Sequence, residues 1–274
     1  MTSPLTARPE PAELSDRLLR LAGEAGRAGV DAVVVAPGAD LHYLLGTSIA
    51  SHERLTCLVV PAAGDPSLVV PVLERPGWNG TPAEQLGLPF HTWADGEDPY
   101  RVLAELLPGD ARVLGVDLYM PAMHALGLQA AVPGSELTLA GGLLAALRMR
   151  KTPAEQDALH AVGAAIDRVQ RRVGEWLRPG RTEREVAADI AAAIVAEGHE
   201  RADFVIVGSG PNGASPHHEA SDRVIGPGEP VVIDIGGPAP NGYNSDCTRT
   251  YVTGGADIDP QVIEVYEVVR AAQA

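Results

Sequence analysis

Apolar residues recur at helical spacing near the start of the chain, and short runs of β-branched residues follow them. Turn-forming residues separate these runs. The segments predicted by the pattern are helices over residues 12–29, 100–107 and 121–128, and strands over residues 33–35, 55–61, 68–72 and 113–116. Helices that alternate with strands in this way are typical of an α/β domain.

The second half of the chain opens with two signals for helix starts. Thr152-Pro-Ala-Glu155 combines a Thr N-cap, a Pro at the first helical position and a Glu at the third, and Thr182-Glu-Arg-Glu185 repeats the Thr and Glu spacing. The elements predicted here are helices to about residues 177 and 197, strands over 204–207, 231–235 and 247–253, and a last helix starting at Asp259-Pro260. This half is therefore predicted to be two helices followed by a mainly antiparallel sheet.

The composition narrows the classes of function. Of the 274 residues, 45% are hydrophobic and 21% charged, and the net charge of −15 argues against nucleic acid or an anionic membrane as a partner. No apolar run approaches the roughly 20 residues of a membrane span, and residues 1–11 lack the apolar stretch of a signal peptide, so we expect a cytoplasmic protein. The two cysteines, Cys57 and Cys247, are expected to be free thiols.

Two aspartates stand on the strands of a predicted β-hairpin. Asp234 follows the apolar run 231–233, and Asp246 lies beyond a turn rich in Gly, Pro and Asn. A hairpin folded symmetrically about Pro240 would place the two carboxylates directly opposite each other, with Cβ atoms roughly 5 Å apart. Because like charges in that position destabilise a sheet, a divalent cation held by oxygen ligands is the simplest compensation.

A solvated hairpin with two surface acids is the competing interpretation. Simple alternation along the strands places Thr248 and Thr250 on the same face as the two aspartates. It places Tyr243, Cys247 and Arg249 on the opposite face. The threonine hydroxyls could then support the carboxylates, whereas Arg249 lies on the wrong face for an ion pair with them. Two acids alone fall short of the about four to six ligands of a complete metal site.

A Gly-rich loop over residues 208–218 ends in His217 and His218. The loop lacks the Lys and Ser/Thr spacing of a P-loop, and the chain has no GxGxxG motif, so phosphate binding is not indicated. We interpret it as a loop that delivers imidazoles to a site, where they can line a metal centre or polarise a reacting carbonyl. A solvated pair of histidines is the alternative.

These motifs resemble a known enzyme family. Ser209-Gly-Pro-Asn…Pro-His217, followed by Asp234-x-Gly…Gly242-Tyr-x-Ser-Asp246-x-Thr-Arg-Thr250, is similar to the metal-dependent Xaa-Pro peptidases, the prolidase and aminopeptidase P group of the creatinase/methionine aminopeptidase or "pita-bread" superfamily (metallopeptidase family M24). Residues 37–46 and 53–55 resemble the creatinase-type N-terminal domain, and residues 150–155 resemble the usual start of the catalytic domain. The resemblance implies an α+β architecture, with a creatinase-like α/β N-terminal domain over residues 1–143 and part of a pita-bread catalytic domain over residues 144–274.

The resemblance also implies a site and a reaction. In the family a dinuclear centre is held by two Asp, one His and two Glu; the aspartates map onto Asp234 and Asp246, with Asp246 bridging both ions. His217 matches the histidine that contacts substrate near the metals, and His218 is the second candidate for that role. The implied cofactors are two divalent ions, Mn²⁺ first and Co²⁺ or Zn²⁺ next. The implied reaction is hydrolysis of proline-containing peptides or dipeptides at Xaa-Pro bonds.

The family places its remaining His and two Glu further towards the C-terminus than Ala274. We therefore expect the 274-residue chain to be a truncated part of a longer protein, inactive by itself, and the resemblance implies a homodimer. One alternative is a non-peptidase enzyme of the same fold, either a creatinase-like hydrolase or a metal-dependent lyase. The retained aspartates argue against the creatinase type, which works without metal. A catalytically dead binding module is the other alternative.

Overall fold

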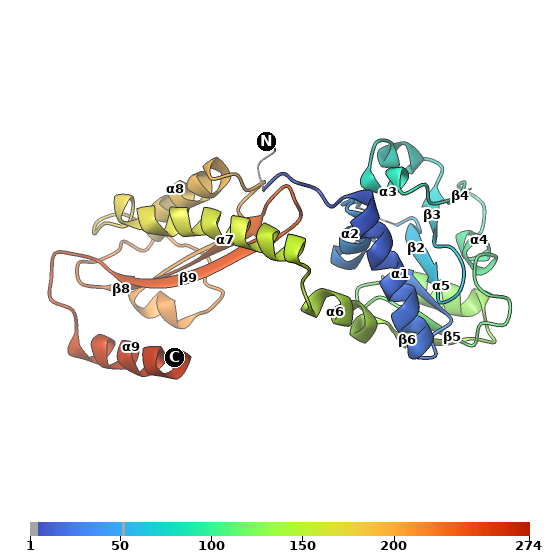
Figure 1. The fold of residues 1–274 in the computed structure, drawn as a ribbon. Coiled ribbons are helices and arrows are strands. Elements are labelled where there is room, and N and C mark those ends of the chain that lie inside the picture. Colours follow the sequence, from blue (N-terminus) through green and yellow to red (C-terminus); the bar gives the residue numbers. More distant parts are fainter. Residues whose placement is uncertain (1–4, 51–52) are drawn as a thin grey trace. The chain divides into compact units, whose positions relative to one another are not determined.

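The computed structural model describes residues 5–50 and 53–274, which form two compact units (Figure 1). One unit is Arg8–Thr152, and the other combines Pro153–Ala274 with the N-terminal residues up to Ala7. In the second of these units, the backbone N–H of Asn241 donates to the carbonyl of Leu5 at 2.9 Å, which fastens the start of the chain to the later unit.

The unit Arg8–Thr152 is built on a six-stranded mixed sheet of order β4-β3-β2-β1-β5-β6. Its strands are β1 Ala32–Val35, β2 Cys57–Pro61, β3 Ser67–Pro71, β4 Phe90–Trp93, β5 Val113–Val116 and β6 Glu136–Leu139. Its helices are α1 Pro11–Arg27, α2 Ala39–Leu45, α3 Pro82–Gln85, α4 Pro99–Ala104, α5 Ala122–Ala131 and α6 Gly141–Met149, with a 3-10 turn at Arg75–Trp78. The predicted α/β architecture of this half is confirmed.

Strand β1, near the middle of the sheet, is apolar along its whole length because its side chains are buried on both faces of the sheet. Val33 and Val35 pack into one core with α1, α2 and α6, while Ala32 and Val34 pack into a second core with residues of α4 and α5. All four side chains are fully buried, so the strand carries no polar alternation.

Helix α6 determines where this unit ends. Its Leu144 and Leu147 are buried in the same core as Leu18 and Leu21 of α1. The predicted boundary after residue 143 therefore falls inside a packed helix. The first compact unit extends to Thr152, and the later unit begins at Pro153.

The later unit consists of an antiparallel sheet of order β7-β8-β9 with two helices on one face (Figure 1). Its elements are α7 Pro153–Arg172, α8 Glu183–Ala196, β7 Phe204–Ser209, β8 Pro230–Pro238, β9 Asn244–Val252 and α9 Pro260–Gln273, with 3-10 turns at Val173–Glu175 and Gly210–Ala214. Every second residue of β8 from Val231 to Ile235 is fully buried against α7 and α8. The predicted order of two helices and then an antiparallel sheet is confirmed.

Cys57 and Cys247 are free thiols, as predicted, and burial raises the pKa of each, most strongly for Cys57. Asp259 caps α9 by accepting a hydrogen bond from the backbone N–H of Gln261 at 2.9 Å. Across the described part of the chain, no helix combines the length and apolar character that crossing a membrane requires.

Candidate metal centre

The register of β8 and β9 sets the relation between the two aspartates. Asp234 lies opposite Thr248, and Asp246 lies opposite Gly236. The predicted direct Asp–Asp pair is therefore wrong. The two residues are diagonal neighbours on one face of the sheet, which corresponds to a separation of roughly 7 Å between them.

The turn of the hairpin is the reason for this shift. The backbone N–H of Gly242 donates to the carbonyl of Ala239 at 2.9 Å, and Ala239 itself pairs with Tyr243. Gly242 has φ +85°, so a left-handed residue is added after the tight turn, as in three-residue hairpin loops. The centre of the hairpin therefore falls at Asn241 and not at Pro240.

The carboxylates lie on the face of the sheet that α7 and α8 do not cover. On the opposite face, Cys247 and Tyr251 pack against the core beneath α7, and Arg249 lies 3.8 Å from Asp167 of that helix. The predicted partition of the β9 side chains between two faces agrees with these contacts. Asp246 is exposed and Asp234 half-buried, so both carboxylates are accessible.

The donors present fit part of a divalent-metal site. The Thr248 hydroxyl donates to Oδ1 of Asp234 at 2.6 Å, which orients that carboxylate as the sequence suggested. No hydrogen bond from the described residues occupies the carboxylate of Asp246. Residues 5–50 and 53–274 contain no cluster of three or more His, Cys, Asp or Glu able to hold an ion, so the aspartates supply two oxygen-donor side chains of a larger ligand set.

The two histidines of the predicted site loop have different environments. Nε2 of His218 lies 2.7 Å from Oε2 of Glu183, and His218 is half-buried, whereas His217 is exposed. Among the described residues, no hydrogen bond joins His217 to either aspartate. The structure therefore brings Asp234 and Asp246 onto one face and leaves His217 on the adjoining loop.

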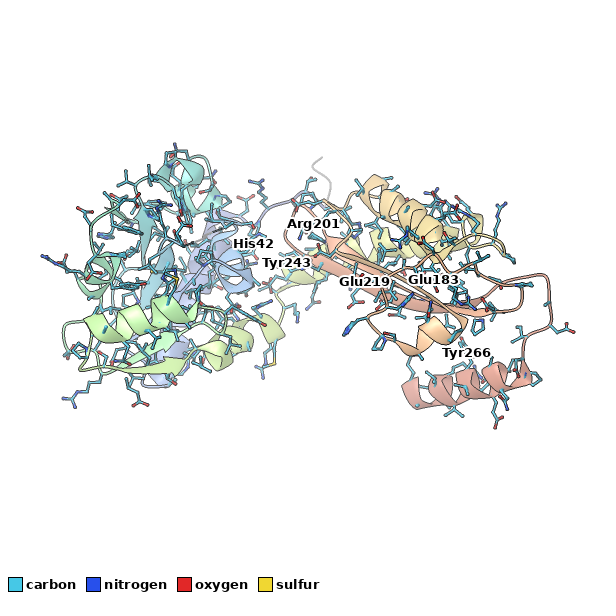
Figure 2. The ribbon with its side chains drawn as sticks, turned by 180° about the vertical axis from the view of Figure 1, so that it is seen from behind. His42, Glu183, Arg201, Glu219, Tyr243 and Tyr266 are labelled. Carbon is cyan, nitrogen blue, oxygen red and sulfur yellow. The ribbon has the colours of Figure 1, made fainter. Side chains whose placement is uncertain are left out.

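Glu183 is a residue of this region that the sequence pattern did not reveal (Figure 2). It is fully buried. Burial alone would raise the pKa of its carboxyl, but hydrogen bonds from Ser209, Ser221 and His218 outweigh burial and hold the pKa well below its usual value. At the first position of a helix an acid is ordinarily an exposed partner of the helix dipole, and nothing in the sequence marks this one as buried.

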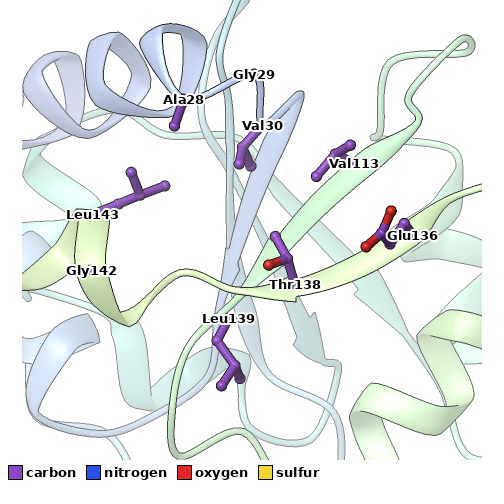
Figure 3. Close-up of a pocket in the computed structure, with 9 residues that line it drawn as sticks. All are labelled: Ala28, Gly29, Val30, Val113, Glu136, Thr138, Leu139, Gly142 and Leu143. Carbon is purple, nitrogen blue, oxygen red and sulfur yellow. The ribbon is translucent and has the colours of Figure 1, made fainter.

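A pocket in the unit Arg8–Thr152 is unrelated to the aspartates (Figure 3). Its volume is about 440 Å³ and it lies beside strands β5 and β6. The lining residues are Ala28, Gly29, Val30, Val113, Glu136, Thr138, Leu139, Gly142 and Leu143. The lining offers one carboxylate and one hydroxyl side chain among apolar groups and glycines, and neither aspartate of the candidate site belongs to it.

Replacement of Thr248 by Val is expected to weaken Mn²⁺ binding by about tenfold, because loss of a hydrogen-bonded supporting group has an effect of that order. Val keeps the β-branched shape and removes only the hydroxyl that orients Asp234. Thr250→Val is the matched control, since Thr250 shares the face and strand but makes no hydrogen bond with the described residues through its side chain. Calorimetric titration of both variants checks this, and equal affinities for the two would contradict it.

The α/β unit is followed along the chain by an antiparallel sheet with an acidic pair on its open face, which is the order that the resemblance to the pita-bread metallopeptidases implies. Comparison with family models agrees with this class: residues 17–150 match the creatinase/prolidase N-terminal domain, and residues 157–274 match metallopeptidase family M24. A relative that is 50% identical to this chain supports the same class. The chain belongs to metallopeptidase family M24. The resemblance and the fold class expected from the sequence are thereby confirmed.

Several proteins similar to this chain are named as dipeptidases or prolidases. A protein named probable dipeptidase PepE from Mycobacterium tuberculosis is 50% identical over 263 residues, which cover 96% of this chain and 69% of that protein. The crystal structure of dipeptidase PepE from Mycobacterium ulcerans superposes with a TM-score of 0.89 at 48% identity, covering 95% of this chain and 70% of that one. A prolidase from Thermococcus sibiricus gives a TM-score of 0.82 at 32% identity, covering 94% and 70% of the two chains.

Proposed function

We propose that this protein is a divalent-metal-dependent peptidase that hydrolyses Xaa-Pro bonds in dipeptides or short peptides. The observation that supports it most directly is the pair Asp234 and Asp246 on the open face of the sheet, with Asp234 oriented by Thr248. Relatives named Xaa-Pro dipeptidase, such as that of Pyrococcus furiosus at 28% identity, favour the choice of substrate.

Each residue has a defined task in this proposal. Asp234 and Asp246 would hold the ions, and bound divalent ions would supply Lewis acidity and activate water near neutral pH. His217 is exposed on its loop, where substrate can reach it, and its imidazole N–H would stabilise the negative charge that develops on the scissile carbonyl oxygen. We propose Mn²⁺ as the first choice of ion, with Co²⁺ or Zn²⁺ next, and a homodimer in the cytoplasm.

The experiment uses a pair of matched dipeptides and controlled metal content. Protein produced from its natural gene and treated with a chelator is expected to be inactive, and added Mn²⁺ is expected to restore cleavage of Leu-Pro well above that of Leu-Ala. Equal cleavage of both dipeptides would contradict Xaa-Pro specificity. Mn²⁺ binding without cleavage of either dipeptide would favour a metal-dependent lyase. Absence of Mn²⁺ binding in the protein produced from its natural gene would favour a binding module.

The inactivity of the 274-residue chain by itself stays a prediction. Asp234 and Asp246 offer fewer donors than a dinuclear centre requires, so a chain limited to them is expected to bind metal weakly. Purified protein with an intact mass of 28.6 kDa and strong Xaa-Pro hydrolysis would overturn this prediction.

A further inference from the structure

The buried carboxylate of Glu183 accepts hydrogen bonds from both ends of the loop that carries His217. Oε1 of Glu183 accepts hydrogen bonds from the backbone N–H of Ser209 at 2.8 Å and from its hydroxyl at 2.6 Å. Oε2 accepts from the backbone N–H of Ser221 at 3.1 Å and from its hydroxyl at 2.7 Å. Ser209 is the last residue of β7 and Ser221 follows the histidines, so a single side chain fixes where the loop leaves and where it returns.

The same carboxylate also holds the middle of the loop. The amide nitrogen of Asn212 lies 3.0 and 3.2 Å from its two oxygens, and Nε2 of His218 lies 2.7 Å from Oε2. An ionised carboxylate can only accept, so Nε2 of His218 carries the proton of this hydrogen bond. The position of Glu183 at the N-terminus of the 14-residue helix α8 favours its negative charge.

An ion pair between Arg223 and Glu229 reinforces the base of the loop. Arg223 donates to the hydroxyl of Ser209 at 2.7 Å and to Oε2 of Glu229 at 2.8 Å. The backbone adds two further links, since the N–H of Glu183 donates to the carbonyl of Arg223 and the N–H of Arg184 donates to the carbonyl of Ser221. The loop is therefore anchored at both of its ends to the start of α8.

The two adjacent histidines of the loop have different surroundings. His218 is held against Glu183, and its neighbour His217 is left exposed. We infer that Glu183, acting through His218, is a positioning residue that determines which imidazole the loop presents to substrate. This inference rests on the proposed peptidase function, whereas the anchoring of the loop can be tested without activity.

Four variants test the inference. Glu183→Gln keeps the shape but turns one acceptor into a donor among donors. His218→Ala removes one donor and leaves the serine contacts, so it folds even if Glu183→Gln does not. His218→Gln returns an amide donor and serves as the rescue variant. Glu185→Gln is the matched control, because Glu185 lies one half-turn away in the capping box, where Gln is also accepted, and does not contact the loop.

Amide hydrogen exchange gives the readout that is independent of activity. Glu183→Gln is expected to speed exchange at Ser209 and Ser221 by roughly 10- to 100-fold, as the loss of hydrogen bonds to a charged acceptor implies. His218→Ala is expected to speed exchange only at the residues between Ser209 and Ser221. The exchange rates of His218→Gln and Glu185→Gln are expected to match those of the wild type. Unchanged exchange across residues 209–221 in both Glu183→Gln and His218→Ala would overturn the inference.

Kinetics separate positioning from mere stability. In Glu183→Gln and His218→Ala, kcat is expected to fall by up to about 100-fold with little change in KM, as it should in His217→Ala, because a misplaced group acts on the transition state. Combining either change with His217→Ala should add little further loss. A loosened loop with unchanged kcat would overturn the positioning role while the peptidase proposal stands. If the wild-type protein produced from its natural gene hydrolyses no Xaa-Pro peptide, the proposed function fails. The exchange data still decide whether Glu183 fixes the conformation of the loop.

Discussion

Replacement of Asp246 by Asn is expected to lower Mn²⁺ affinity by at least roughly 100-fold, the upper range for loss of supporting groups around a metal, and to abolish hydrolysis. The reason is chemical: the amide removes the negative charge from the one carboxylate of the pair that no described residue occupies. Metal titration by calorimetry and the chelator-treated peptidase assay are the measurements.

The same substitution is expected to leave the fold intact. Asp246 is exposed and lies diagonal to a like charge at Asp234, so removing its charge changes the free energy of unfolding by no more than about 0.5 kcal/mol. Asp257→Asn is the matched control, since it makes the same change at an exposed position of the same unit. Wild-type Mn²⁺ affinity in Asp246→Asn would exclude the aspartate pair as a metal centre.

Strong buried elements could be predicted from the sequence, whereas weak edge elements could not. The strands β1, β2 and β5, and β3 after its first residue Ser67, are apolar runs because both faces of the sheet are covered. The unpredicted strands β4 and β6 lie at the two edges of that sheet, are mostly half-buried or exposed, and mix polar with apolar residues. Helix α2 is only seven residues long, too short for a periodic signal to develop.

For the candidate site, alternation along a strand was predictable and register was not. Placing Asp234 and Asp246 on one face requires only the period of two, which both strands keep. Their diagonal offset depends on the left-handed conformation of Gly242, which a symmetric fold about Pro240 ignores. The role of Glu183 depends on tertiary contacts with a loop about 30 residues later, and local pattern carries no information about such contacts.

Replacement of Gly236 by Ala is expected to destabilise the protein by about 3 kcal/mol. A Cβ atom at Gly236 would lie 2.3 Å from the carbonyl oxygen of Ser245 and 2.6 Å from the ring of Phe204. The oxygen belongs to the backbone of β9, so the clash can be relieved only by moving that strand where Asp246 lies opposite Gly236. Denaturant unfolding followed by circular dichroism measures the loss, and weaker Mn²⁺ binding should accompany it.

Gly163→Ala is the control with the same chemical change and the opposite expected sign. Gly163 lies inside helix α7, and an added Cβ would meet nothing within 4 Å, so Ala is expected to stabilise the protein by about 0.5–1 kcal/mol. The contrast isolates the close approach of β9 as the cause, because both variants lose a glycine and gain one methyl group. If Gly236→Ala were as stable as wild type, the tight packing of β8 against β9 would not be what fixes Asp246 beside Asp234, and the geometry of the candidate metal centre would need another source.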